Sequence, residues 1–222
     1  MPSRSMFKDH PDIVPPYLAD KMTVTDLVEV MGRTSFEARN VYRAARLLTR
    51  MVTEDDTIWL GIAGAGIAGG MGGMIVSLIE AGVIDVICST GAQVYHDLHF
   101  AFELPVKAIS PVWDDDALRR HGDTRIYDIG IREKETLEAQ DEIIRRFVQE
   151  SYHEHLAGRP LSSWEFNRAL GLWVAEKSQY PRRCFVAAAD EHGVPIFWDS
   201  LANHSIAMNL VRTDRTAIAA VL

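Results

Sequence analysis

The sequence TIWLGIAGAGIAGG, residues 57–70, decides the predicted fold. Its first seven residues are apolar at consecutive positions, which is typical of a parallel strand buried on both faces. The last seven form a glycine-rich turn, and a helix is predicted from about residue 67 to residue 81. The turn matches the GxGxxG pattern, whose small residues let the backbone approach a pyrophosphate at a helix N-terminus. The alternative is close helix–strand packing alone, because Gly72 and Gly73 continue the run of glycines.

A second apolar run, VIDVIC at residues 83–88, predicts another buried strand. The turn Ser89-Thr90-Gly91 follows it and opens a helix through residues 95–102. This alternation of strand and helix predicts an α/β fold with a doubly wound, mostly parallel sheet and helices on both of its faces. Further predicted helices are 134–156, 164–177 and 187–192, and further predicted strands are 124–131, 194–198 and 216–222.

The predicted domain organisation is an N-terminal arm, residues 1–22, and one domain, residues 23–222. Pro15-Pro16 prevents a helix within the arm, and the remaining length suits a single domain. The predicted last strand ends the chain with nothing after it to cover a sheet edge. This pattern predicts that the chain is a fragment, or that a partner chain covers the edge.

The overall composition is that of a globular protein, with 47% hydrophobic and 24% charged residues. The formal charge is 23 − 31 = −8, which argues against a nucleic-acid partner and favours small or cationic ones. No run approaches the roughly 18 apolar residues that a membrane span needs, and the N-terminus lacks the apolar core of a signal peptide. Cys88 and Cys184 lie outside any CxxC pair and predict neither a disulfide framework nor a zinc cluster. We therefore expect a cytoplasmic protein.

The second turn, Ser89 to Ala92, follows its strand at the carboxyl end, where open parallel sheets bind ligands. Two such turns side by side would form one crevice, and the alternative is a plain turn. Asp85 lies at about the separation of a ribose-binding acid from the first turn, but it falls inside the predicted strand. No ribose contact is therefore predicted for Asp85.

His96 and His99 are three residues apart on a predicted helix, a spacing that invites a metal interpretation. No third ligand is evident from spacing, and the helix lacks a Glu-x-x-His pattern. We therefore predict no metal site. The favoured interpretation is a hydrogen-bonded histidine within the protein, with His96 available as a polar group that faces the crevice.

Several of these segments together resemble the deoxyhypusine synthase family, and more closely its bacterial deoxyhypusine synthase-like branch. The run STGA at residues 89–92 with YHDLH at residues 95–99 looks specific to that branch. The resemblance is also carried by TSFEARN at 34–40, WLG at 59–61 with the small-residue turn to Gly70, VIDVIC at 83–88 and VPIF at 194–197. Their order and spacing agree with the family over nearly the whole chain.

This resemblance implies a Rossmann-like NAD-binding fold that assembles as a homotetramer, with active sites between paired subunits. The family passes a hydride from spermidine to NAD and transfers the aminobutyl group through an imine on an enzyme lysine to an acceptor amine. NADH then returns the hydride. The implied partner is a polyamine substrate, spermidine or, as a small acceptor in bacterial relatives, putrescine.

Residue by residue, the resemblance implies NAD contacts at both turns and at two further places. In the first turn the family's polar residues are small apolar ones here, so only backbone hydrogen bonds remain. His96 stands where eukaryotic relatives have a glutamate, and both acids of a further family segment are absent from residues 202–208. The implied cofactor-binding residues are Gly64, Ala65, Ala68, Thr90, Gly91, Ala92, His96, Asn203 and Ser205.

No catalytic residue is predicted in this chain. The family's imine-forming lysine lies in a C-terminal segment, and the lysines present here occur in other contexts. Because an imine needs an uncharged amine nucleophile, we expect this chain alone not to complete the family reaction. One alternative is a non-catalytic NAD-binding or scaffold paralogue. Another is an ordinary NAD(P) dehydrogenase, which the lack of a Tyr-Lys or His-Asp set after the first turn disfavours. The five lysines are Lys8, Lys21, Lys107, Lys134 and Lys177.

Overall fold

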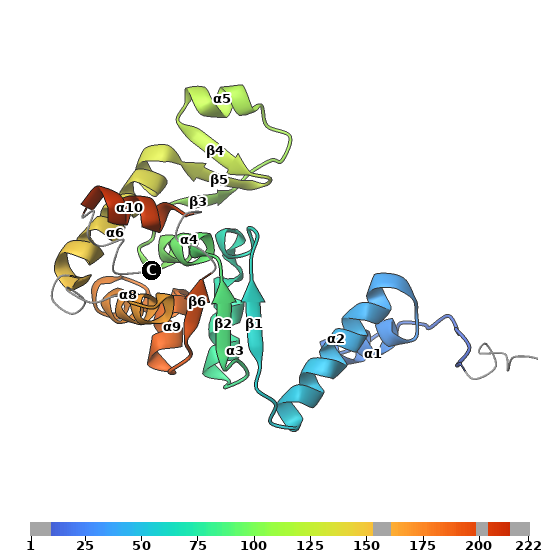
Figure 1. The fold of residues 1–222 in the computed structure, drawn as a ribbon. Helices are drawn as coiled ribbons and strands as arrows, with labels where there is room; N and C mark the ends of the chain where they lie inside the picture. The colour runs from blue at the N-terminus through green and yellow to red at the C-terminus, as the bar shows by residue number, and fades with distance from the viewer. Residues whose placement is uncertain (1–9, 153–160, 199–203, 214–222) are drawn as a thin grey trace, which may run out of the picture. The chain divides into compact units, whose positions relative to one another are not determined.

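The computed structural model describes residues 10–152, 161–198 and 204–213 (Figure 1). The chain forms two compact units, Met1–Thr57 and Ile58–Leu222. The predicted strand 216–222 lies outside the described residues. The predicted boundary between an arm and a domain after residue 22 stays a prediction.

The first unit contains two helices, α1 (Val24–Gly32) and α2 (Phe36–Thr53). Thr23 begins α1 with a capping box: its hydroxyl accepts from the Asp26 N–H at 3.2 Å, and the Asp26 carboxylate accepts from the Thr23 N–H at 2.9 Å. α2 carries an apolar stripe beside several arginines, yet neither helix contains a buried residue. Leu47, for example, is exposed. The apolar stripe of α2 is therefore without cover within this unit.

The second unit is built on a parallel three-stranded sheet in the order β1-β2-β6 (Figure 1). Its strands are β1 (Trp59–Ile62), β2 (Val86–Ser89) and β6 (Ile196–Trp198). β1 and β6 lie within strands predicted from the sequence, and β2 overlaps the strand predicted at 83–88 and extends one residue further, to Ser89. The α/β class and the parallel pairing are thus confirmed.

The helices of this unit cover one face of the parallel sheet. Ile87 and Ile196, neighbours in register on that face, are buried in the main hydrophobic core. The core also takes in apolar side chains from the helices that follow the strands. These helices include η2 (Ile67–Met71), α3 (Gly72–Glu80), α4 (Gly91–Ala101), α8 (Ser163–Lys177) and α9 (Phe185–Glu191). The short η5 (Pro181–Arg183), between α8 and α9, contains no buried residue.

The opposite face of the sheet is exposed within the second unit. Gly61, Cys88 and Phe197 are neighbours in register on this face, and all three are exposed. Trp59, two residues before Gly61, is 63% exposed. The strand order explains this, because two right-handed crossovers in the same direction place their helices on the same face. The described strands are therefore singly wound, and a doubly wound sheet with helices on both faces stays a prediction.

A second, antiparallel sheet has the order β3-β5-β4. The single strand predicted at 124–131 was wrong, because the chain reverses at Tyr127, whose φ is +55°. Asp114 begins α5, accepting from the Ala117 N–H at 2.6 Å. The elements are β3 (Val106–Ala108), α5 (Asp115–Arg120), β4 (Asp123–Ile126) and β5 (Ile129–Arg132).

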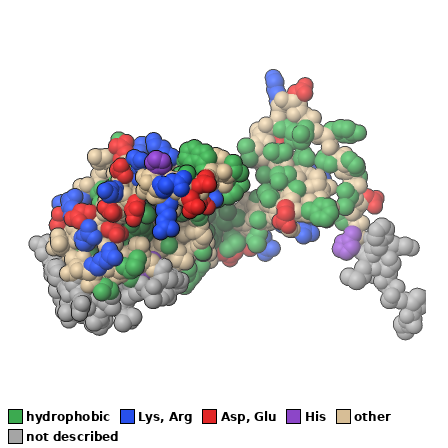
Figure 2. All heavy atoms as spheres, turned by 90° about the horizontal axis from the view of Figure 1, so that it is seen from above, with side chains coloured by type: hydrophobic (Ala, Val, Ile, Leu, Met, Phe, Trp, Pro, Cys, Tyr) green, Lys and Arg blue, Asp and Glu red, His purple; other side chains and the backbone are tan. Residues whose placement is uncertain are grey.

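The long helix predicted from residue 134 exists as one helical stretch that is π-helical at both described ends and α-helical between them. It runs through η3 (Glu133–Glu138), α6 (Ala139–Phe147) and η4 (Val148–Tyr152). The last described helix, α10 (Ser205–Thr213), packs against α6 and α4. Among the described helices, none combines the length and apolarity needed to cross a membrane. Figure 2 shows basic side chains interspersed with acidic ones over the face that carries α5.

Candidate functional site

The two small-residue turns lie side by side at the carboxyl end of the parallel sheet, where the strands terminate. β1 and β2 are paired in register from Trp59↔Val86 to Ile62↔Ser89, so their carboxyl ends meet there. The Thr90 N–H donates to the Ile62 carbonyl at 3.3 Å. The Gln93 side chain, on α4, donates to the Gly64 carbonyl and ties the second turn to the first. The structure thus brings together the two turns that the sequence predicts to form one crevice.

The first turn is open and lined by backbone. Gly64 has a φ of +83°, a conformation that suits glycine, and a Cβ there would meet no atom within 4 Å. Ala65 is exposed and lies two residues before η2, which begins at Ile67 after Gly66 and whose first N–H groups have no partner within the helix. Ala68 is buried, so its side chain packs into the core. An anion at Gly64 and Ala65 would therefore meet backbone N–H groups, whereas the Met71 sulfur lies 3.0 Å from where a Cβ at Gly66 would stand.

The second turn is covered by the protein itself. Thr90 begins α4 without a side-chain capping hydrogen bond. The imidazole of His204 lies directly over Gly91, and a Cβ at Gly91 would overlap that ring. The ring also stacks on Trp198, with centroids 4.7 Å apart and planes inclined by 20°. Gly91 is therefore close-packed, and its amide is not an open cradle.

The other predicted residues are distributed around these turns. Ala92 and His96 are both half-buried and lie four residues apart on α4, so they share one stripe of that helix. Ser205 is half-buried at the first position of α10, directly after His204. Asn203 lies outside the described residues.

His99 is a hydrogen-bonded histidine inside the protein, as predicted. It is fully buried, with its Nε2 3.0 Å from the Nδ1 of His96 and its Nδ1 3.3 Å from the Oε1 of Gln140. Burial lowers the pKa of His99 to about 3, and burial also lowers the pKa of His96. Both rings are therefore neutral near pH 7. Among the described residues, no group of three or more His, Cys, Asp or Glu side chains is placed to hold a metal ion.

Asp97 is a buried polar residue that the sequence reasoning missed. Its Oδ2 accepts from the Val186 N–H at 3.2 Å. A Cβ at Gly72 would lie 2.9 Å from its Oδ1, so Gly72 leaves room for the carboxyl group. Burial raises the pKa of Asp97 to about 7. The spacing from Gln93 is a signal that could have found it, since polar residues four apart on a buried helix face need partners.

Tyr95 belongs to a second polar cluster, which joins α4 to α6 and α10. Its hydroxyl donates to Asp141 Oδ1 at 3.0 Å, and the Asn209 amide donates to the same oxygen at 2.7 Å. Burial and the neighbouring Asp141 carboxylate raise the pKa of Tyr95. This cluster fixes the helix that carries Ala92 and His96.

Asp85 lies at the amino end of the sheet, opposite the two turns, and has a structural role there. Its Oδ2 accepts from the Ile58 N–H at 2.7 Å, just before β1 begins. The amino end of β1 faces away from the two turns. Asp85 is thus far from any ribose at the turns, in agreement with the sequence prediction.

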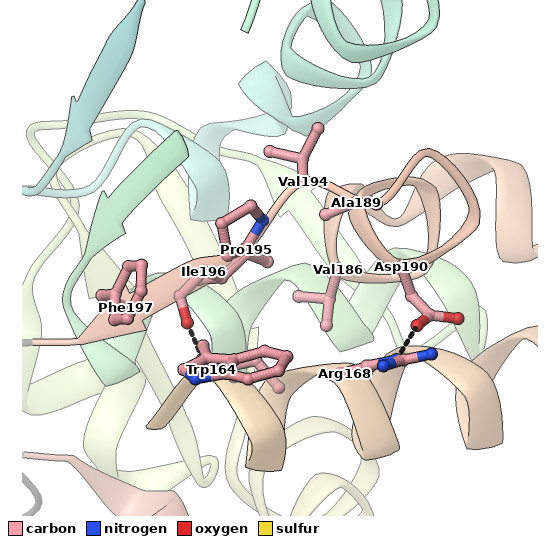
Figure 3. A pocket seen from close by; sticks show the side chains of 11 residues that line it. Trp164, Arg168, Val186, Ala189, Asp190, Val194, Pro195, Ile196 and Phe197 are labelled. Atoms are coloured by element: carbon pink, nitrogen blue, oxygen red, sulfur yellow. Dashed lines mark hydrogen bonds and ion pairs between the residues drawn. The ribbon is translucent and has the colours of Figure 1, made fainter. Parts of the chain in front are cut away.

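A separate pocket of about 490 Å³ lies between α8, α9 and β6 (Figure 3). Its walls include Val194 and Pro195 at the amino end of β6, and the Arg168–Asp190 ion pair, at 3.6 Å, lies at its side (Figure 3). The Asn167 side chain donates to the Ile196 carbonyl at 3.0 Å. None of the predicted site residues lines this pocket.

The fold defines the chain as an α/β protein in which two small-residue turns meet at the carboxyl ends of parallel strands. The family model described as deoxyhypusine synthase matches residues 26–219. The chain therefore belongs to the deoxyhypusine synthase family.

Individual relatives carry the same family name. A deoxyhypusine synthase-like protein of Thermosynechococcus vestitus is 32% identical over 203 residues, which cover 89% of this chain and 49% of the relative. The protein named "Probable deoxyhypusine synthase 2" of Methanosarcina mazei is 32% identical over 197 residues, covering 88% of this chain and 55% of the relative. The chain thus spans about half the length of these curated relatives.

A solved structure shares the fold. The crystal structure described as that of a deoxyhypusine synthase from Entamoeba histolytica superposes with a TM-score of 0.62 at 15% sequence identity. The match covers 90% of this chain and 66% of the other. At this identity the similarity concerns the fold alone.

The packing of His204 on Gly91 predicts a strong coupling between the two positions. Gly91→Ala should lower the free energy of unfolding by about 1–3 kcal/mol, because the added methyl group overlaps the imidazole. In a His204→Ala background the same change should be neutral or stabilising, since alanine favours helix by up to about 1 kcal/mol over glycine. Urea unfolding of the four proteins of this double-mutant cycle measures the coupling. Equal effects of Gly91→Ala in both backgrounds would show that His204 does not occupy this position.

The buried Asp97 predicts a pH-dependent stability. Its pKa of about 7 in the folded state lies above the ordinary 3.8, so the folded state keeps a proton that the unfolded state loses between about pH 4 and 7. Stability should therefore fall as pH rises through this window, by up to about 4 kcal/mol relative to Asp97→Asn. Other titrating groups, including His99, are common to both proteins and cancel in the difference. Urea unfolding of wild type and Asp97→Asn at several pH values tests this, and a pH-independent difference would contradict it.

Proposed function

We propose that this chain is an NAD-dependent aminobutyltransferase of the deoxyhypusine synthase family that acts on spermidine or a related polyamine, with the cofactor held at the two turns. The adjacency of the turns, tied by the hydrogen bond from Gln93 to Gly64, carries this proposal. It is supported by the family membership. The net charge of −8 suits a polycationic substrate.

The first turn fits the diphosphate of NAD. Gly64 and Ala65 leave the N-terminus of η2 open, and the small side chains admit a close approach of the ligand. When bound, NAD supplies a hydride acceptor. The protein's part is to orient it, through backbone N–H groups at Gly64, Ala65 and Ala68.

The second turn contributes its outer side to the proposed site. Thr90 and Ala92 are half-buried and remain accessible, whereas His204 covers Gly91. We assign His96, one helical turn beyond Ala92, to the same crevice. Ser205, the first residue of α10, and Asn203, two residues earlier in the sequence, complete the proposed set.

The imine-forming lysine is proposed to come from outside these 222 residues. Lys21, Lys107, Lys134 and Lys177 are all exposed among the described residues. Glu176 accepts a hydrogen bond from Lys177 at 2.8 Å and raises its pKa, which favours the charged, non-nucleophilic form. A desolvated lysine of the kind that forms imines is absent from the part of the chain that the structure describes.

The chain is also proposed to work as a cytoplasmic homo-oligomer, a tetramer by family resemblance, with a Rossmann-like, doubly wound sheet in the complete assembly. The exposed apolar face around Trp59 and the uncovered stripe of α2 support an oligomer, because parallel sheets are ordinarily covered on both faces.

A second candidate is a non-catalytic NAD-binding or scaffold paralogue. The covering of Gly91 by His204 and the exposure of the described lysines favour it. It differs from the first candidate in product formation, whereas both allow a cofactor to bind at the first turn.

Cofactor binding is tested by a charge placed at the first turn. Ala65→Asp should weaken NAD binding about tenfold or more, because the carboxylate repels the diphosphate at the helix N-terminus. The same charge should not destabilise the fold, since an acid is favourable at that end of a helix. Calorimetric titration with NAD measures the affinity, and the nearly isosteric Ala65→Asn is the neutral control. If Ala65→Asp and Ala65→Asn bind NAD with equal affinity, NAD does not bind at the first turn. If the wild-type chain gives no binding heat at millimolar NAD, only the scaffold candidate remains.

The catalytic proposal is tested by following the product. With spermidine, NAD and putrescine, the chain alone should give no homospermidine by mass spectrometry. Product should appear when a polypeptide that carries the family's lysine segment is added. Product from the chain alone would contradict the assignment of the nucleophile. Absence of product in both cases, together with NAD binding, would favour the scaffold paralogue.

A further inference from the structure

His96, His99 and Gln140 form a row of hydrogen bonds that runs from α4 into the protein. His96 Nδ1 lies 3.0 Å from His99 Nε2, and His99 Nδ1 lies 3.3 Å from Gln140 Oε1. His99 and Gln140 are fully buried, whereas His96 is half-buried. The row therefore has one end in the core and the other near the surface.

The order of donors along this row follows from its buried end. A carbonyl oxygen only accepts, so Gln140 Oε1 requires a proton on His99 Nδ1. A neutral imidazole carries one N–H, so His99 Nε2 is then an acceptor. His96 must consequently donate from its Nδ1. Its Nε2 is left with a lone pair.

The His96 side chain is half-buried, and its Nε2 has no hydrogen-bond partner within the described residues. Ala92 lies one helical turn earlier on the same stripe of α4, beside the second turn. His96 Nε2, the acceptor atom, thus lies on the same stripe of α4 as Ala92, one helical turn from the proposed crevice.

We propose that His99 and Gln140 are positioning residues that hold His96 as its Nδ1–H tautomer, so that His96 Nε2 accepts a hydrogen bond from an N–H or O–H group of a bound ligand. The identity of that ligand rests on the proposed function, and two sources are available there: a hydroxyl group of NAD and an amino group of the polyamine. The tautomer itself depends only on the row of side chains.

The tautomer is measured directly by nuclear magnetic resonance of the chain with ¹⁵N-labelled histidine. At pH 7.5 His96 should show a protonated Nδ1 and an unprotonated Nε2, with its signals assigned through His96→Gln. His192 is an internal reference, because its Nδ1 lies 3.0 Å from the Ala188 carbonyl, which can only accept. A protonated Nε2 on His96 in the wild-type chain would overturn the proposal. It would show that the Gln140 amide nitrogen faces His99 and donates to its Nδ1, so that every hydrogen bond of the row has the opposite direction.

The positioning role is tested by Gln140→Met, which keeps a similar shape and removes the acceptor. Both tautomers of His96 should then be populated, and affinity for the ligand that uses Nε2 should fall about fivefold to tenfold. Thr136→Val is the matched control, because it removes a different buried hydrogen bond of the same helical stretch, from Thr136 to the Pro105 carbonyl at 2.7 Å. An unchanged His96 tautomer in Gln140→Met would overturn the proposal.

The source of the donor group is separated by titrating NAD alone and spermidine alone. The ligand that bonds to His96 should shift the ¹⁵N resonance of its Nε2 and leave that of His192 in place. If either ligand binds by calorimetry without moving this resonance, that ligand is excluded as the donor, and exclusion of both overturns the acceptor role. Failure of both ligands to bind at all would instead overturn the proposed function. The tautomer of His96 in the ligand-free chain would still test the role of His99 and Gln140.

Discussion

Parallel pairing of β1 with β2 is the constraint on which the candidate site depends. Strands that run in the same direction end at the same edge, so the two turns are separated by about one strand spacing of roughly 4.8 Å. The hydrogen bond from Gln93 to Gly64 then closes the gap between the turn after β1 and the helix after β2. At the opposite edge, Asp85 holds the start of β1 through the Ile58 N–H. The open first turn and the half-buried stripe of α4 both follow from this arrangement.

The same topology leaves one face of the sheet without cover in the second unit. Successive crossovers in one direction bury Ile87 and Ile196 and leave Trp59 and Phe197 exposed. The residues in register on the exposed face carry no charge, so water is the poorer environment for them. The curated relatives are about twice as long as this chain. Contact with a further polypeptide layer is the simplest way to give this face the burial that parallel sheets ordinarily have, and it is the basis of the proposed oligomer.

The sequence predicts those parts of the structure that depend on neighbouring residues. Consecutive apolar residues in 57–63 and 83–88 identify strands, and the glycines after them identify turns, because both signals are local. The burial on both faces that these runs also predict is not seen within the second unit, where Trp59 and Cys88 are exposed. The reversal at Tyr127 escaped prediction, since a non-glycine residue with positive φ gives no compositional sign of a turn. The covering of Gly91 by His204 also escaped, because it depends on how a distant segment packs against α4. The adjacency of the turns could thus be foreseen, while the closure of one of them could not.

Two histidines three residues apart on a helix are compatible with a metal site and with a hydrogen-bonded row, and the sequence alone favours neither by its spacing. The structure separates these interpretations through Gln140, on a different helix. An amide oxygen at 3.3 Å from His99 Nδ1 occupies one ring nitrogen, and His96 occupies the other at 3.0 Å. A histidine with both nitrogens engaged has no lone pair left for a metal ion. Burial keeps the His99 ring neutral, so the row can hold one proton order without a counter-charge. Of the four ring nitrogens of this pair, only the outer nitrogen of His96 is left without a partner among the described residues, and it is the nitrogen that we propose as a ligand acceptor.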